Sequence, residues 1–332
     1  MKVLRLHASG DLRFHDEPAP VPEMGEALLR VKAVGICGSD LHWFHESGIG
    51  DARLLKTLVL GHEFSAIDQG TGRLVAVDPA IPCGQCEFCL EGNSNLCPAV
   101  RFAGHAEVDG AFREYISWPE RNLYPLPETM DAAAGAMLEP LGVALHATDL
   151  AQLQPGMQIG VFGCGPIGLL IIQLARRYGA VQIIASDRLA HRVEAASQSG
   201  AHQAVQVNET GFLPDLQELA GAHGLDVVFE VAGENPAVES AIAAVKPGGE
   251  VILVGIPSLD TTSFRASTAR RKGLTIKLCR RMKNTYPRAI DLVSKGMIDV
   301  SSLVTHSFPL ERALEAFSVA ERREGLKVII EI

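Results

Sequence analysis

The stretch that decides the fold reads MQIGVFGCGPIG over residues 157–168. Its first half, residues 157–162, is almost entirely apolar and predicts a buried strand. The apolar spacing of residues 169–178 predicts an amphipathic helix directly after the glycines. A G-x-G-x-x-G sequence between a strand and a helix is typical of proteins that bind a dinucleotide.

Each glycine of this turn has a separate physical reason. Gly163 allows the tight turn, Gly165 lets a pyrophosphate approach the backbone, and Gly168 lets the helix pack closely on the strand. Pro166 and Ile167 lie in this turn, just before the predicted helix, whose N-terminus supplies N–H groups that would bind the phosphates.

A second predicted strand, residues 181–186, ends at Asp187, 19 residues after Gly168. An acid at this place accepts hydrogen bonds from the ribose hydroxyls and repels a 2′-phosphate, which favours NAD over NADP. Arg188 and Arg192 follow, and one of them could lie over the adenine or neutralise a 2′-phosphate.

Strands and helices alternate from this point to about residue 279. The predicted strands are 204–207, 225–230, 250–254 and 274–277, and the predicted helices are 190–199, 213–222 and 236–245. This alternation predicts an α/β fold with a doubly wound parallel sheet and right-handed crossovers.

The two ends of the chain have a different character. Residues 1–80 predict short strands, among them 27–34 and 74–77, separated by glycine and proline turns, in a mainly β, barrel-like domain. The last part predicts helices at 287–295 and 310–320 and a final strand at 327–331, which we expect to return to the first domain.

Four cysteines form a compact motif. Their spacing is C-x2-C-x2-C-x7-C, made by Cys83, Cys86, Cys89 and Cys97. Four thiolates this close can surround one tetrahedral zinc ion, and such a closed set is structural. An iron–sulfur cluster is the rival reading, but ferredoxin runs have a final gap of three residues and this chain has seven.

A second group of metal-capable residues interrupts apolar sequence. His62 and Glu63 follow the apolar residues 58–60, and Cys37 lies between glycines in residues 34–42. A thiolate, an imidazole and a carboxylate with a fourth position left to water make a catalytic zinc site. The alternative is that the cysteine and histidine are ordinary core residues.

Glu139 belongs to a predicted helix over residues 131–150 and lies on an otherwise apolar face, just before Pro140. A proline here removes a backbone hydrogen bond, and a buried carboxylate needs a partner. A metal is the obvious candidate, and a solvated or backbone-bonded glutamate is the alternative.

The composition excludes several classes of protein. A chain of 332 residues with a formal charge of -9 suggests two domains and argues against nucleic acid or an anionic membrane surface as a partner. It contains no run of about 18 apolar residues. Five of the seven cysteines fall between Cys37 and Cys97, and residues 1–7 do not form a signal peptide, so we expect metal ligation in the cytoplasm.

Taken together, these motifs resemble those of the zinc-dependent medium-chain dehydrogenase/reductase superfamily, in particular its polyol (sorbitol-type) branch. The resemblance covers nearly the whole chain. It is carried by VGICGSDLH at 34–42, GHE at 61–63, the four-cysteine motif, LEPL at 138–141 and GCGPIG at 163–168.

The resemblance implies a GroES-like catalytic domain in two pieces, residues 1–145 and 279–332, around a Rossmann domain at 146–278. It implies an active site in the cleft between them, two zinc ions per chain, NAD, and a homo-oligomer of two or four subunits.

The resemblance also implies roles for individual residues. Cys37 and His62 correspond to catalytic zinc ligands, and Glu139 to the glutamate of sorbitol-type relatives. Glu63 corresponds to a catalytic glutamate that binds the zinc directly or lies just behind the ligands. The other implied assignments are a proton relay at Ser39 and His42, an adenosine ribose site at Asp187 and Arg192, and a structural zinc on Cys83, Cys86, Cys89 and Cys97.

The chain departs from the family pattern at two places. Ala66 replaces an expected glycine, and residues 67–73 are a shortened connection. Polyol relatives have an arginine–tyrosine pair before an Asn-Thr-aromatic-Pro run, but here Arg280 and Arg281 precede that run without the tyrosine. These arginines are candidate substrate ligands, and a surface arginine cluster is the alternative.

The leading hypothesis is an NAD-dependent dehydrogenase that oxidises a secondary hydroxyl of a polyol to a ketose. The zinc ion would bind that hydroxyl and lower its pKa, so that the proton leaves more easily. A sugar-acid (L-idonate-like) dehydrogenase and an L-threonine dehydrogenase are alternatives within the enzyme class. A nucleotide-binding protein without catalytic activity is the alternative from another class.

Overall fold

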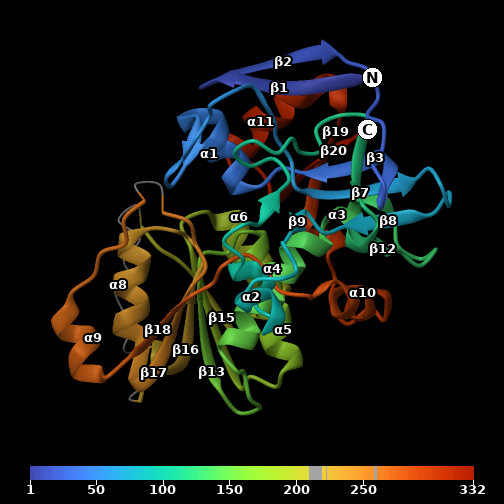
Figure 1. Cartoon of the computed structure of the whole chain (residues 1–332). Coiled ribbons are helices and arrows are strands. Elements are labelled where there is room, and N and C mark those ends of the chain that lie inside the picture. The colour runs from blue at the N-terminus through green and yellow to red at the C-terminus, as the bar shows by residue number, and fades with distance from the viewer. Residues whose placement is uncertain (209–218, 222, 258–259) are drawn as a thin grey trace. The chain divides into compact units, whose positions relative to one another are not determined.

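The computed structural model describes residues 1–208, 219–221, 223–257 and 260–332. The chain divides into two compact units, one of Met1–Pro140 with Lys283–Ile332 and one of Leu141–Met282, whose elements are labelled in Figure 1. None of the described helices has the length and apolar content needed to cross a membrane. The predicted helix at 213–222 lies largely outside the described residues.

The second unit contains a six-stranded sheet in the order β15-β14-β13-β16-β17-β18, and every neighbouring pair is parallel. The strands are β13 (Gln158–Phe162), β14 (Gln182–Asp187), β15 (Gln203–Gln206), β16 (Leu225–Glu230), β17 (Val245–Leu253) and β18 (Thr275–Leu278). This order, which starts at a central strand and proceeds to each edge in turn, confirms the predicted doubly wound α/β fold.

Helices precede the first of these strands or connect one strand to the next. They are α4 (Leu138–Leu150), α5 (Pro166–Arg177), α6 (Ala190–Gln198), α8 (Asn235–Ala244) and α9 (Ala266–Lys272). Helix α5 buries its apolar face, including Leu169, Ile172 and Leu174, in agreement with the predicted amphipathic pattern. Helix α9 was not predicted, because most of its residues are polar and the helix is short.

The first unit is built on a seven-stranded sheet with the order β12-β8-β7-β3-β20-β19, and β11 also pairs with β3. Its strands are β3 (Glu26–Gly35), β7 (Glu63–Asp68), β8 (Leu74–Val77), β11 (Tyr115–Pro119), β12 (Leu123–Pro125), β19 (Val304–Pro309) and β20 (Lys327–Glu331). The C-terminal strand β20 pairs antiparallel with β3, so the end of the chain belongs to the first unit.

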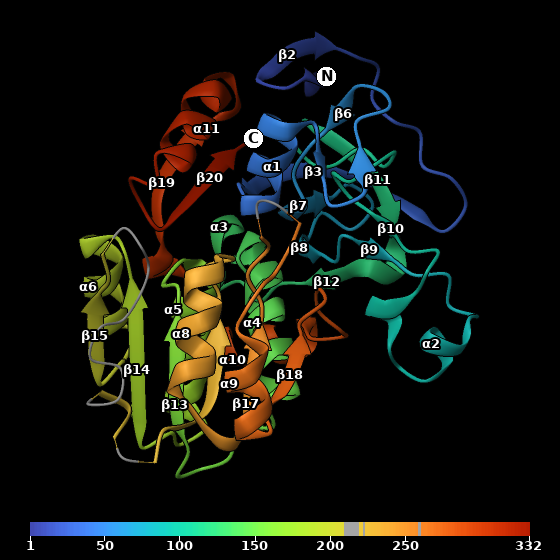
Figure 2. The same cartoon turned by 90° about the vertical axis from the view of Figure 1, so that its left-hand side faces the viewer.

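Shorter elements surround this sheet. The strands are β1 (Lys2–Ala8), β2 (Asp11–Asp16), β4 (Gly48–Ile49), β5 (Ala52–Arg53), β6 (Leu58–Val59), β9 (Ala80–Ile81) and β10 (Arg101–Phe102). The helices are α1 (Gly38–Glu46), α2 (Glu87–Leu90), α3 (Ala132–Ala136), α10 (Tyr286–Ser294) and α11 (Ala313–Glu321). In Figure 2, the segment that contains α2 extends away from β9 and β10.

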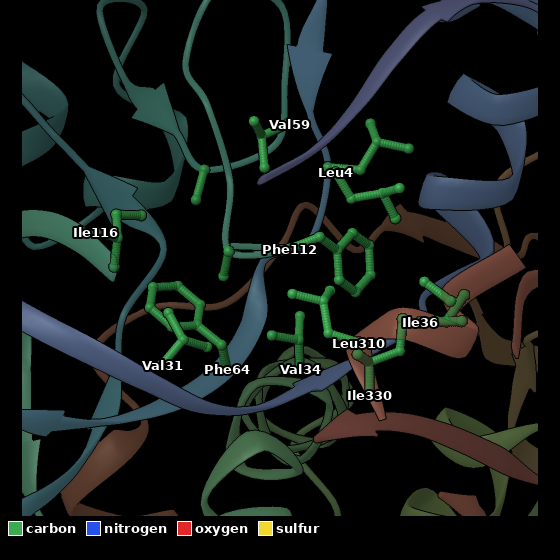
Figure 3. Packing of buried hydrophobic residues seen from close by; sticks show 14 of the residues in the cluster. Leu4, Val31, Val34, Ile36, Val59, Phe64, Phe112, Ile116, Leu310 and Ile330 are labelled. Atoms are coloured by element: carbon green, nitrogen blue, oxygen red, sulfur yellow. The ribbon is translucent and has the colours of Figure 1, made fainter. Parts of the chain in front are cut away.

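The core of the first unit lies between these strands. Figure 3 shows Val34, Ile36, Phe64, Phe112 and Ile330 among its buried side chains. Full burial of each such side chain contributes about 1.5–3 kcal/mol. Val34 and Ile36 flank the end of β3, so the core fixes the backbone that leads into Cys37.

The expected single helix over residues 131–150 is two helices, α3 and α4, separated at Met137. Pro140 lies in the first turn of α4, a position that tolerates proline, and it lacks the N–H that would bond to the carbonyl of Ala136, the last residue of α3. The proline therefore interrupts the helix as expected, and Glu139 lies at the start of α4.

Candidate metal centres and dinucleotide site

Three metal-capable side chains from two neighbouring strands come together in the first unit. Cys37 is the N-terminal cap of α1, two residues after the end of β3, while Glu63 begins β7 and His62 directly precedes it. Glu63 pairs with Gly35 in the β3–β7 ladder. One ligand atom of each of the three side chains lies within 4.8 Å of the others.

Asp40 holds this group in place. Its buried carboxylate accepts the backbone N–H of Cys37 at 2.8 Å and that of Gly61 at 3.1 Å. The same carboxylate lies 3.6 Å from His62 Nδ1, which leaves Nε2 of the imidazole for a metal. Burial lowers the pKa of His62, but the negative charge of Asp40 outweighs it and holds that pKa well above its usual range.

Lys327, the first residue of β20, forms a fully buried ion pair with Glu63. Burial lowers the pKa of Lys327, but Glu63 and Cys37 together raise it above its usual value. Gly35 makes room for this pair, because a Cβ on Gly35 would overlap the Glu63 carboxylate and approach Lys327 Cε to 2.8 Å.

Glu139 is also buried, in the first turn of α4, and burial raises its pKa to about 7. The positive charges of His62 and Lys327 partly oppose that rise, which places the carboxyl near them. Its oxygen atoms are not within the 4.8 Å group formed by Cys37, His62 and Glu63. Binding of a metal by Glu139 therefore stays a prediction.

The donors of this group are the types that zinc prefers. A thiol, an imidazole nitrogen and a carboxylate oxygen make three protein ligands and leave a fourth tetrahedral position open. The residues therefore fit a zinc ion with room for one further ligand, the arrangement of catalytic sites.

The four cysteines form a second group, with all four sulfur atoms within 4.8 Å of one another. Cys86 Sγ lies 3.4 Å from Cys89 Sγ, and Cys83 Sγ lies 4.0 Å from it. A tetrahedral zinc with bonds of about 2.3 Å holds its sulfurs about 3.8 Å apart, so the group fits zinc. Backbone N–H groups of Gln85 and Cys86 lower the pKa of Cys83 to about 6, which favours the thiolate that zinc binds.

The predicted relay residues lie on α1. Ser39 Oγ is 3.5 Å from His62 Nε2, so the serine faces the zinc group. His42, three residues later, contacts Glu46 through Nδ1 at 3.1 Å. The sequence placed both residues near Cys37, and their role in proton transfer stays a prediction.

The glycine turn of the second unit has the geometry that a pyrophosphate needs. Gly163 has a φ of +105°, and a Cβ on it would lie 2.6 Å from the backbone nitrogen of Ala232. A Cβ on Gly165 would meet nothing closer than Arg192 Nη1 at 3.7 Å, so the space above this residue is open. Helix α5 begins at Pro166, with Gly165 as its cap and Ile167 in the first turn.

Asp187 ends β14, and both of its carboxylate oxygens accept backbone N–H groups. Cys164 donates to one oxygen at 2.8 Å and Leu189 to the other at 2.9 Å. The carboxylate is thereby fixed beside the glycine turn, and its remaining lone pairs can accept ribose hydroxyls. This part of the chain fits a dinucleotide.

Arg280 and Arg281 follow β18 in the second unit. Arg281 has a φ of +52°, an uncommon left-handed conformation for a residue with a side chain. Contact of these arginines with a substrate stays a prediction.

The sequence analysis missed two residues of the buried group, Asp40 and Lys327. An acid three residues after a helix cap is a recognisable capping pattern, and Asp40 stands in that relation to Cys37. No local signal identifies Lys327, because its partner Glu63 lies far away from it in the sequence.

Comparison with known proteins agrees with this geometry. Residues 23–128 match the alcohol dehydrogenase GroES-like domain family, and residues 166–295 match the zinc-binding dehydrogenase family. Sorbitol dehydrogenase of Bacillus subtilis is 36% identical over 341 aligned residues, covering 99% of this chain and 97% of that protein.

Two solved structures extend the comparison. An alcohol dehydrogenase from Escherichia coli CFT073, solved with NADH, has a TM-score of 0.91 and 29% identity, covering 100% of this chain and 99% of that chain. L-idonate 5-dehydrogenase from Escherichia coli has a TM-score of 0.88 and 27% identity, covering 100% of this chain and 98% of that chain.

The family matches, the near full-length similarity and the two fitting metal groups lead to one conclusion. The protein has a structural four-cysteine zinc site and a catalytic cysteine, histidine and glutamate site, and it acts on CH–OH groups with NAD(P). The chain therefore belongs to the zinc-dependent medium-chain alcohol dehydrogenase superfamily.

Proposed function

We propose that this dehydrogenase oxidises a secondary hydroxyl of a linear polyol to a ketose, with NAD as the hydride acceptor. The observation that supports this most is the oxygen-rich character of the buried group. Glu63 belongs to the group, Glu139 is buried close to His62, and the group has one cysteine only. The similarity to Bacillus subtilis sorbitol dehydrogenase along nearly the whole chain agrees with it.

Different residues of the first unit would bind the zinc ion and transfer the proton. Cys37 and His62 would hold the zinc, together with Glu63 or Glu139. Bound zinc supplies Lewis acidity that lowers the pKa of a coordinated hydroxyl. Ser39 Oγ would then accept the hydroxyl proton while its own proton moves on toward His42, which would return one proton to solvent.

NAD supplies the hydride acceptor chemistry, and the second unit supplies its binding site. The glycine turn and the N-terminus of α5 would bind the pyrophosphate, and Arg192 lies over the Gly165 backbone. Asp187 would accept the ribose hydroxyls.

Asp187 should also make the enzyme prefer NAD to NADP. A 2′-phosphate placed against this fixed carboxylate meets a like charge, and we expect that penalty to exceed any help from Arg188. Measurement of kcat/KM with each cofactor decides the point. A preference for NADP would show that the arginines dominate.

The polar groups assigned to the substrate should determine which alcohol is oxidised. Glu139 and an arginine from Arg280 or Arg281 offer hydrogen bonds to several hydroxyl groups, and a simple aliphatic alcohol would leave them unpaired. We therefore expect polyols of about four to six carbons, the range of sorbitol-type relatives, to be better substrates than ethanol. The second candidate is a sugar acid, which the two arginines and the likeness to L-idonate 5-dehydrogenase favour.

A substrate panel tests the proposal. The purified enzyme would be assayed with NAD on tetritols, pentitols, hexitols, aldonates, L-threonine and ethanol, with products identified by mass spectrometry. A polyol should give the highest kcat/KM and a ketose product, and Arg281→Ala should raise KM for the polyol far more than for NAD. Faster turnover of an aldonate would assign the arginines to a carboxylate, and faster turnover of ethanol would contradict the proposal.

The assembly of the enzyme is a separate part of the proposal. A dimer or tetramer in the cytoplasm is the expectation from the family resemblance. Light scattering after size-exclusion chromatography would distinguish these states from a monomer.

A further inference from the structure

The end of α1 has a polar contact that the proposed proton path does not yet use. His42 Nδ1 lies 3.1 Å from a carboxylate oxygen of Glu46, the last residue of the helix. The side chain of His42 is 20% exposed and that of Glu46 is 50% exposed. Ser39 lies one turn before His42, and three-residue spacing places the two on one helix face. From the buried zinc group to solvent, the helix therefore presents Ser39, His42 and Glu46 in order.

Helix stability does not explain the position of Glu46. The C-terminal end of a helix carries partial negative charge, so a carboxylate there is unfavourable. An acid that follows its cationic partner by four residues is also in the less favourable orientation for a helical pair. The helix ends immediately afterwards, because Ser47 has a φ of +51° and its N–H bonds to the Trp43 carbonyl at 3.0 Å. Glu46 is thus held at the end of a defined turn, within reach of His42.

We propose that Glu46 is a positioning residue for His42 in proton release, an inference that rests on the proposed function. An ionised carboxylate only accepts hydrogen bonds, so a neutral imidazole bonded to it carries its proton on Nδ1. Nε2 of His42 then bears the lone pair and receives the proton that leaves the substrate hydroxyl. The resulting imidazolium keeps its Nδ1–H on Glu46 and returns the Nε2 proton to water, so one proton enters and one leaves.

A second histidine–glutamate contact, between α1 and α11, provides a control. His45 Nε2 lies 3.4 Å from a carboxylate oxygen of Glu321, and the two side chains are 40% and 49% exposed. This pair has the same chemistry and a glutamate of similar exposure, its histidine is more exposed than His42, and it has no role in the proposed proton path. Removal of the Glu321 carboxylate therefore measures what an exposed histidine–glutamate contact contributes in general.

The kinetic test compares Glu46→Ala, Glu46→Gln, His42→Ala, the double variant Glu46→Ala/His42→Ala, and the control Glu321→Ala. Glu46→Ala should lower kcat for alcohol oxidation about three- to tenfold with KM for NAD unchanged, the range that an exposed charge-assisted hydrogen bond supports. Glu46→Gln should lose less, because its amide oxygen still accepts from Nδ1. The double variant should be no slower than His42→Ala, and Glu321→Ala should match the wild type.

Nitrogen NMR of histidine-labelled protein gives a readout that does not depend on turnover. The His42 signal, assigned by its loss in His42→Ala, should report protonation on Nδ1 in the wild type and a shift toward the Nε2–H form in Glu46→Ala. An unchanged tautomer would overturn the inference, as would full turnover in Glu46→Ala or an equal loss in the His42→Ala background. Full turnover in His42→Ala would instead refute the proposed proton path and, with it, this inference.

Discussion

The two metal-ligand groups of the first unit are assembled in opposite ways. The four cysteines come from one short segment, residues 83–97, in a lobe where Cys83 is exposed. The other group joins the end of β3, the start of β7 and the start of β20, and its histidine, glutamate and lysine are all buried. The first group has four thiols and the second has one.

This difference shows how the number of protein ligands and their burial determine whether a zinc site is structural or catalytic. A closed set of four thiolates leaves no position for a substrate, so its metal can only support structure. Three mixed donors leave one position open, and burial excludes water that would compete for it. Burial also demands compensation of charge, which Asp40 and Lys327 supply.

The largest expected effects come from exchanging one ligand in each group. Cys37→Ser should reduce turnover by about 10³-fold or more, because the metal supplies several kcal/mol of transition-state stabilisation. Its thermal midpoint should stay within a few degrees of the wild type. Cys89→Ser should show the reverse, with a clearly lower midpoint and measurable turnover below it, because a structural zinc contributes directly to folding.

Kinetics and calorimetry on both variants check this exchange of phenotypes. The assignment of one catalytic and one structural site would be contradicted if Cys37→Ser unfolded as readily as Cys89→Ser. It would also be contradicted if Cys89→Ser abolished turnover while its fold remained intact.

The next effect concerns the buried cation. Lys327→Met leaves the Glu63 carboxylate buried without its partner, which should cost about 3–5 kcal/mol of stability. A second change, Glu63→Gln, should restore most of that loss, since it removes the uncompensated charge. Lys295 forms a comparable ion pair with Asp291 at the surface, and Lys295→Met should change stability by less than about 0.5 kcal/mol.

Denaturant unfolding of the four proteins measures these values. Equal effects of Lys327→Met and Lys295→Met would contradict the view that the buried group depends on charge compensation.

The smallest effect comes from a buried carboxylate of the second unit, Glu230 at the end of β16. Burial raises the pKa of Glu230 to about 7 from an ordinary value of 4.5. No ion pair to it exists in the described part of the chain, and it accepts the N–H groups of Ala232 and Gly233 at 2.8 Å. Between these pH values the folded protein holds a proton that the unfolded chain releases, so stability falls as pH rises from about 4.5 to 7 and then levels off.

Glu230→Gln keeps the oxygen that accepts both N–H groups and removes the ionisation. It should therefore raise stability above pH 7 by up to about 3 kcal/mol and have little effect at pH 4.5. Thermal midpoints at pH 5 and pH 8 provide the measurement. An equal change at both pH values would show that the carboxyl is not protonated in the folded state.

The sequence predicted most of the fold because its signals are local. The apolar runs gave β8 and β16 with the observed ends, and the glycine turn placed β13 and α5. The four cysteines needed only their spacing. The two-residue strands β4 and β5 and the polar helix α9 carry no such periodicity and were not predicted.

The candidate site was only partly predictable for the same reason. Cys37, His62 and Glu63 interrupt apolar sequence and were identified from that pattern. Lys327 reaches Glu63 only after β20 has paired with β3, so no window of sequence contains both partners. The position of Glu139 depends on the break between α3 and α4, which Pro140 indicates but which the continuous apolar pattern does not locate.

The most direct test of the central claim is elemental analysis of the wild type, Cys37→Ser and Cys89→Ser after identical purification. Two groups with separate tasks predict close to two zinc ions per chain in the wild type and close to one in each variant, with turnover abolished in Cys37→Ser alone. Iron in place of zinc, or a single equivalent of zinc in the active wild type, would contradict the account.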